Sequence, residues 1–186
     1  MYMSPLTISV VVLVVLGLWL AGAFNSLVRS RNRVKESWSD IDVQLKRRYD
    51  LIPNLVETVK GYAEHERSTL DAVIETRSKA MGAQSVAEHA QAENMLTGAL
   101  KSLFALSEAY PQLRAVESFA KLQDELSDTE NKIQAARRFY NNNVMTLNTA
   151  IESFPTNTIA SSFGFHKEEF FQLNEEAARE PVAVKF

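Results

Sequence analysis

The chain has 186 residues, a net charge of -3 at pH 7 and no cysteine. The absence of cysteine excludes disulfides and thiolate chemistry, and the negative net charge gives no reason to expect a nucleic-acid partner. Glycine and proline are scarce, at 6 and 5 residues, and no stretch alternates apolar and polar residues as a strand does. We therefore expect an all-α fold of long helices joined by few turns.

Residues 1–28 carry no charged side chain. Within them, Leu6 to Phe24 reads LTISVVVLVVLGLWLAGAF, interrupted only by one threonine and one serine. As a helix, these 19 residues would span about 28 Å, which is about the thickness of a bilayer's hydrocarbon core. The run therefore predicts a transmembrane helix and the lipid bilayer as a partner.

Basic residues follow the apolar run rather than precede it: Arg29, Arg31, Arg33 and Lys35. A cleaved signal peptide has its basic region before the apolar core, so an uncleaved anchor is favoured, although Ala-Gly-Ala at 21–23 could serve as a cleavage site. Positive charge stays on the cytoplasmic side, so we expect the N-terminus outside and the rest in the cytoplasm. These four membrane-proximal residues could also contact anionic lipid head groups.

The stretch from Trp38 to Tyr62 continues the helical pattern but contains Pro53. Its apolar residues form one stripe: Trp38, Ile41, Leu45, Ile52, Leu55, Val59 and Tyr62. Proline inside a helix removes a hydrogen bond and costs about 3 kcal/mol. The helix therefore either kinks at Pro53, or ends near Asp50 and restarts with Pro53 in its first turn. The pattern then continues to Gly82, a helix stop.

Two further helices are predicted. The spacing of Ser85 and Glu88 is that of a capping box, which opens a helix over 86–108 that Tyr110-Pro111 closes. The next segment is the most regular, with apolar or aromatic residues seven apart: Phe119, Leu126, Ile133, Tyr140, Leu147 and Phe154. This heptad pattern indicates the core-facing stripe of a bundle helix, favoured over a coiled coil between molecules.

The C-terminal region is less regular. We expect four aromatic residues to pack back onto the bundle: Phe163, Phe165, Phe170 and Phe171. The sequence thus predicts an anchor over 1–28, an antiparallel bundle of about four long helices over 29–178 that continues the anchor helix, and a disordered tail over 179–186.

Motifs for chemistry are missing from the sequence. No histidine follows a glutamate by three residues, as di-iron bundles require, and no glycine-rich phosphate loop or HExxH motif occurs. We expect no catalytic residues, no metal, no cofactor and no enzyme activity.

Polar residues nevertheless lie on or beside the predicted core stripes: Asp42, Arg48, Glu130, Asn131, Arg137, Tyr140 and Asn141. Glu130 and Arg137 are seven apart and share a helix face. If this face meets Asp42 and Arg48, carboxylates and guanidinium groups form a structural network between helices. The alternative is that each of these residues lies on a solvated face.

Three stretches resemble the LemA family of bacteria: RNRVKESWSDIDVQLKRRYDLIPNLVETVKGYAEHE, YPQLRAVESFAKLQDELSDTENKIQAARRFYNNNV and FPTNTIASSFGF. The resemblance covers nearly everything after the anchor. It implies one membrane helix, an outward N-terminus and a bundle of long antiparallel helices. It also implies relatives at magnetosome membranes, and gene neighbours that encode membrane peptidase-like or TPM-domain proteins. It supplies no catalytic residues.

These observations predict a membrane-anchored scaffold or adaptor at the bacterial inner membrane, acting in envelope maintenance through protein association, including a homo-oligomer. The alternative is a ligand sensor or enzyme that uses Asp42, Arg48, Glu130 and Arg137. A membrane-remodelling protein would need a second apolar or strongly basic surface, which the sequence does not show outside residues 1–35.

Overall fold

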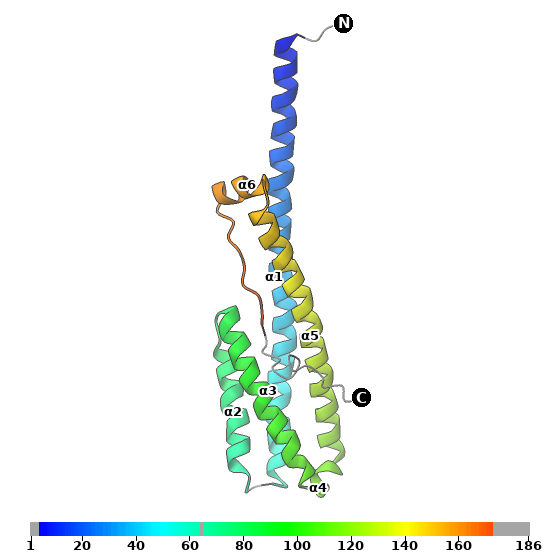
Figure 1. Cartoon of the computed structure of the whole chain (residues 1–186). Helices are drawn as coiled ribbons and strands as arrows, with labels where there is room; N and C mark the ends of the chain where they lie inside the picture. The colour runs from blue at the N-terminus through cyan, green and yellow to red at the C-terminus, as the bar shows by residue number, and fades with distance from the viewer. Residues whose placement is uncertain (1–3, 64, 173–186) are drawn as a thin grey trace, which may run out of the picture. The chain divides into compact units, whose positions relative to one another are not determined.

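The computed structural model describes residues 4–63 and 65–172, and every regular element in this part of the chain is a helix (Figure 1). The helices are α1 (Pro5–Lys60), α2 (Arg67–Gly82), α3 (Val86–Glu108), α4 (Pro111–Arg114), α5 (Glu117–Glu152) and α6 (Thr156–Ser162). The all-α prediction, with four long helices, is confirmed. The predicted tail over 179–186 lies outside the described residues.

The described chain divides into two compact units. Unit 1 comprises residues 4–40 and 136–169, and unit 2 comprises residues 41–135 and 170–172. The long helices α1 and α5 each contribute one part to each unit, whereas α2, α3 and α4 belong to unit 2 and α6 to unit 1.

Helix α1 is continuous through Pro53. The predicted alternative of a helix that ends near Asp50 and restarts at Pro53 is therefore wrong. Pro53 has no N–H to donate to the carbonyl of Tyr49, four residues earlier. That carbonyl instead accepts a hydrogen bond of 2.7 Å from Nε of Arg77 on α2. A side chain from a neighbouring helix thus replaces the bond that proline removes.

The predicted continuation of this helical pattern to Gly82 is also wrong, because the chain reverses after Lys60. The amides of Tyr62 and Ala63 both donate to the carbonyl of Val59, at 3.0 and 2.9 Å, and α2 begins only at Arg67. The reversal brings Leu70 and Val73 of α2 into the core of unit 2. It also leaves Tyr62 48% exposed, so this residue does not extend the apolar stripe.

The helix predicted over 86–108 is confirmed as α3, with both hydrogen bonds of the capping box present. The hydroxyl of Ser85 accepts from the Glu88 amide at 3.2 Å, and the Glu88 carboxylate accepts from the Ser85 amide at 3.3 Å. Two otherwise unpaired amides at the helix start are satisfied in this way.

Helix α5 buries the predicted heptad stripe within the chain: Phe119, Leu126, Ile133, Tyr140 and Leu147. The last member, Phe154, is 85% exposed because α5 ends at Glu152, before the stripe reaches it. Of the four C-terminal phenylalanines, Phe165 and Phe171 are buried as expected, whereas Phe163 and Phe170 are exposed. Phe163 nevertheless packs on α1, because its ring centre lies 4.9 Å from that of Phe24. The expectation is therefore right for three of them and wrong for Phe170, which lies on the surface.

Candidate functional site

The N-terminal part of α1 is apolar and exposed on all sides. A strongly apolar stretch of 18 residues lies in this part of the helix, and none of its residues is buried. Trp19, at 41%, is the least exposed of its large apolar side chains, and Leu6, at 78%, is the most exposed. The core helix of a water-soluble protein hides such side chains, so this helix could span a membrane by both its length and its composition.

The four basic residues that follow this segment differ in their surroundings. Arg29, Arg33 and Lys35 are exposed. Arg31 is half-buried, and its guanidinium carbon lies 5.1 Å from the ring centre of Phe165, in a cation–π contact. Three of the four are therefore available to solvent or lipid head groups, and the fourth stabilises the packing of unit 1.

At the centre of unit 2 lies a buried ionic cluster built on Arg48, whose side chain is only 4% exposed. Arg48 Nη1 donates to Oε2 of Glu93 at 2.9 Å and lies 3.0 Å from Oε2 of Glu130. Its Nη2 donates to the hydroxyl of Thr97 at 2.9 Å. The planar guanidinium thereby connects α1 to α3 and α5.

Tyr49 completes the cluster from the next position on α1. Its hydroxyl donates to Oε1 of Glu93, so both oxygens of this fully buried carboxylate are hydrogen-bonded. Its backbone carbonyl is the one that accepts from Arg77 on α2. Each of the four long helices thus supplies at least one polar group to the same region of unit 2.

Burial dominates the electrostatics of the cluster. It raises the pKa of Glu93, and the positive charge of Arg48 opposes that rise. Burial and the neighbouring Glu93 charge also raise the pKa of Tyr49, which keeps its hydroxyl protonated as a donor. A charge buried in this way stabilises a fold little compared with apolar residues, but removing one partner is strongly destabilising. The cluster therefore favours one alignment of the helices over others.

The structure distributes the seven predicted polar residues unevenly. It brings Arg48 and Glu130 together, whereas Asp42 and Asn131 in unit 2 are exposed. The other three, Arg137, Tyr140 and Asn141, belong to unit 1.

Tyr140 has a separate role in unit 1. Its buried ring lies 5.3 Å from that of Trp38, edge to face, and its hydroxyl donates to the carbonyl of Glu169 at 2.9 Å. Burial raises its pKa to about 12, and the charges of Glu168 and Glu169 add to the rise. The phenol thus holds the segment after α6 against α5.

Sequence reasoning missed Glu93, Tyr49 and Thr97. Glu93 could have been found, because it shares the core-facing spacing of Leu96, Leu100 and Leu103 on α3. A carboxylate in such an apolar stripe needs a buried partner. Arg48 shows the same signal, since it lies between Leu45 and Ile52 on the stripe of α1.

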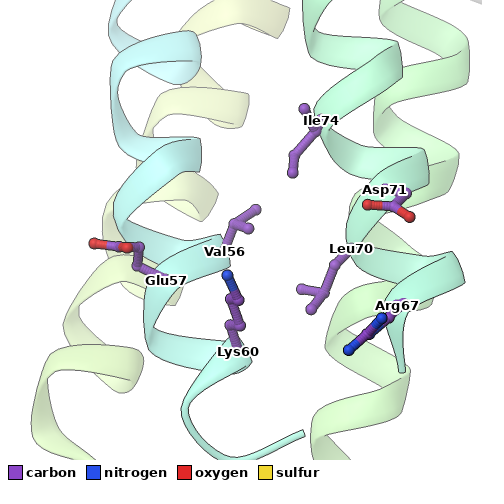
Figure 2. A pocket seen from close by; sticks show the side chains of 7 residues that line it. All are labelled: Val56, Glu57, Lys60, Arg67, Leu70, Asp71 and Ile74. Carbon is purple, nitrogen blue, oxygen red and sulfur yellow. The ribbon is translucent and has the colours of Figure 1, made fainter. Parts of the chain in front are cut away.

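A groove of about 400 Å³ lies between the end of α1 and the start of α2 in unit 2 (Figure 2). The side chains of Val56, Leu70 and Ile74 form its apolar part, and Ile74 is 50% exposed. Charged residues of both signs also line it: Glu57, Lys60, Arg67 and Asp71. None of these seven residues belongs to the ionic cluster.

The model of the LemA family matches residues 37–186. The chain belongs to the LemA family. It is 29% identical over 158 residues to Protein LemA of Metamycoplasma hominis, an alignment that covers 83% of this chain and 71% of that protein. It is also 26% identical over 192 residues to the magnetosome protein MamQ of Magnetospirillum gryphiswaldense, covering 89% of this chain and 71% of the relative. Arg48, Tyr49, Glu93 and Glu130 all lie within the LemA family match.

Proposed function

We propose that this LemA-family protein is a membrane-anchored helical adaptor of the bacterial inner membrane that binds other proteins and a second copy of itself. The observation that carries the proposal is the apolar part of α1, which is exposed on every side yet continues without interruption into the helix that carries Arg48. An adaptor needs a fixed attachment and an accessible binding surface, and needs no reaction.

The proposed orientation has the N-terminus outside and the helices after the anchor in the cytoplasm. It rests on the basic residues that follow the apolar segment, of which Arg29, Arg33 and Lys35 are exposed. Because the chain has no cysteine, single substitutions can be labelled without a background. In intact cells whose outer membrane is permeable, a membrane-impermeant maleimide should label Ser4→Cys but not Asn32→Cys. The reverse pattern would contradict the orientation.

The proposed binding surface is the groove of Figure 2. It combines an apolar part that includes exposed Ile74 with charged residues of both signs, a composition that suits a protein partner better than an anion or a nucleic acid. The partner class that we propose is other membrane proteins, including peptidase-like and TPM-domain proteins in envelope maintenance.

A photo-crosslinking residue at position 74 tests this surface in cells. We expect it to trap membrane proteins or a second copy of the chain. The same residue at Ala72, which is exposed on the other side of the same helix and does not line the groove, should trap neither. Equal products at both positions would contradict a role for the groove.

A ligand sensor or enzyme is the second candidate. It is favoured by Glu130, whose side chain is 29% exposed and is the one carboxylate of the cluster that reaches solvent. Glu130→Gln separates the two roles. If the protein is an adaptor, Glu130→Gln should lose cellular function only to the extent that it loses stability. Arg137→Met, a substitution of a polar residue in unit 1, is the comparison variant for both measurements. Loss of function at unchanged stability would instead support a site at Glu130.

A further inference from the structure

We infer that the corner formed by α6 and its two flanking residues Phe154 and Phe163 inserts into the lipid interface beside the base of the anchor, as a second membrane contact. This inference rests on the membrane anchoring proposed above and adds a second segment, distant in sequence, to the contact. All of the residues concerned belong to unit 1.

Aromatic contacts fix the level of α6 along α1. The ring of Phe163 lies 4.9 Å from that of Phe24, the last residue of the apolar run, and the ring of Phe165 lies 5.8 Å from it. Phe165 in turn lies under Arg31, one helical heptad further along α1. Figure 1 shows α6 beside α1, at the level where the N-terminal stretch of α1 extends past the other helices.

Helix geometry gives the level of Phe154 independently. Trp38 of α1 contacts Tyr140 of α5, and the two helices run in opposite directions in this unit (Figure 1). From Tyr140 to the end of α5 at Glu152 the helix rises about 18 Å, and the same rise along α1 from Trp38 leads to about residue 26. Phe154 therefore lies near the level of Phe24.

That level coincides with the membrane boundary. If Leu6–Phe24 fills the hydrocarbon core, the lipid head groups begin beside Phe24 and extend toward Arg29, the first charged residue. Phe154 is 85% exposed and Phe163 is 64% exposed. Single exposed apolar residues are common on protein surfaces, but two large rings at the foot of a membrane helix suit a segment that lies in the interface, whose apolar side typically carries Trp, Phe or Leu.

The polar residues of the corner are consistent with this position. A hollow of about 720 Å³ beside α6 has hydrogen-bonding side chains in its lining that include Ser161, His166 and Lys167. Lys167 also forms an exposed ion pair with Glu152. Rings that reach into lipid, next to polar groups that remain hydrated, are the combination found in segments that lie in the interface rather than across the membrane.

The test uses the full-length chain in phosphatidylcholine–phosphatidylglycerol vesicles. Two exposed asparagines serve as matched nitroxide positions, Asn157→Cys in the corner and Asn142→Cys further back on α5, with no other cysteine in the chain. We expect the nitroxide at position 157 to be less accessible to a water-soluble nickel reagent, and more accessible to oxygen, than the nitroxide at position 142.

Phe154→Ser should then shift the label at position 157 toward water. Phe139→Ser, the same change at a 55% exposed position further back on α5, should leave it unchanged. The inference is overturned if both asparagine positions are equally accessible to nickel, or if the two serine variants act alike. Spin–spin broadening at position 157 that grows with protein density would also overturn it, because a second copy would then cover the corner.

Vesicle flotation separates the two proposals. A chain that fails to float refutes the anchor as well. A chain that floats with a water-exposed corner refutes only this inference.

Discussion

The N-terminal part of α1 and the centre of unit 2 both depart from the usual pattern of apolar residues inside and charged residues outside. The first exposes apolar side chains from Leu6 to Leu20, and the second buries the charges of Arg48 and Glu93. An exposed apolar helix is unfavourable in water and favourable in lipid, so it defines the solvent that the segment requires. Buried charges require partners instead of a solvent, so they define which helices must meet.

The difference also concerns how each region tolerates change. Any apolar side chain would suit the exposed segment of α1 in lipid, and none of its positions requires a particular neighbour. The cluster depends on named atoms, because Arg48 reaches two carboxylates and a hydroxyl at 3.0 Å or less. Substitutions should therefore act gradually in the first region and sharply in the second.

Removing Arg48 should produce the largest effect. Arg48→Met leaves the Glu93 carboxylate buried without its counter-charge, which costs about 3–5 kcal/mol in comparable sites. We expect a loss of this size in the free energy of unfolding, measured with denaturant in detergent. Lys132→Met, which breaks the exposed pair with Asp128, should cost less than about 1 kcal/mol. Equal losses of unfolding free energy in the two variants would show that the buried cluster contributes no more to stability than an exposed ion pair.

Charging the apolar segment should have the next largest effect. Leu13 is 66% exposed and lies in the middle of the run. Leu13→Asp should disfavour membrane insertion by about 3 kcal/mol on the insertion scale. The measurement is the inserted fraction after translation with membrane vesicles, and Val43→Asp, at an exposed position of α1 beyond the run, is the control. An unchanged inserted fraction for Leu13→Asp would contradict the assignment of this segment to lipid.

Arg77 allows a sharper test of how unit 2 accommodates Pro53. Arg77→Met leaves the Tyr49 carbonyl without its side-chain donor, and we expect a loss of about 1–3 kcal/mol. In a Pro53→Ala background, the restored amide at position 53 can donate to that carbonyl, so the same change should cost less. A double-mutant cycle of unfolding free energies measures this coupling, and a cycle with additive effects would refute it.

The smallest expected effect concerns His89, a half-buried residue of α3. Burial lowers its pKa below the usual 6.5, and the charges of Asp42 and Glu88 partly oppose the shift. The neutral imidazole therefore contributes stability above about pH 6.5, which is lost as pH falls through the lowered pKa. The difference in unfolding free energy between the wild type and His89→Gln should be constant above that pH. Below it, the wild type should lose stability relative to His89→Gln. A wild type that instead gains stability relative to the variant toward acid pH would contradict this.

Much of the fold could be predicted because local signals and tertiary packing agree. The capping box at Ser85 and the heptad stripe of α5 each fix an element from neighbouring residues alone. The behaviour of Pro53 could not be predicted, because it depends on Arg77, which the chain reversal after Lys60 brings to the Tyr49 carbonyl. Local sequence contains no information about that donor.

The candidate site was predictable only in part for a similar reason. The places of Arg48 and Glu130 on or beside core stripes predict their role, whereas Glu93 does not stand out among the apolar residues around it. The exposure of Phe154 could not be predicted, because the heptad pattern continues to this residue although α5 ends at Glu152. In both cases the informative residue is the one that breaks the pattern of its stripe.

The most direct test of the central claim is alkaline carbonate extraction of membranes from cells that produce the full-length chain. Carbonate removes proteins held at the surface by charge and leaves those held by a lipid-embedded helix. The exposed apolar segment of α1 predicts that the chain stays in the membrane pellet. Release of the chain into the supernatant would show that α1 does not span the bilayer and would contradict the account.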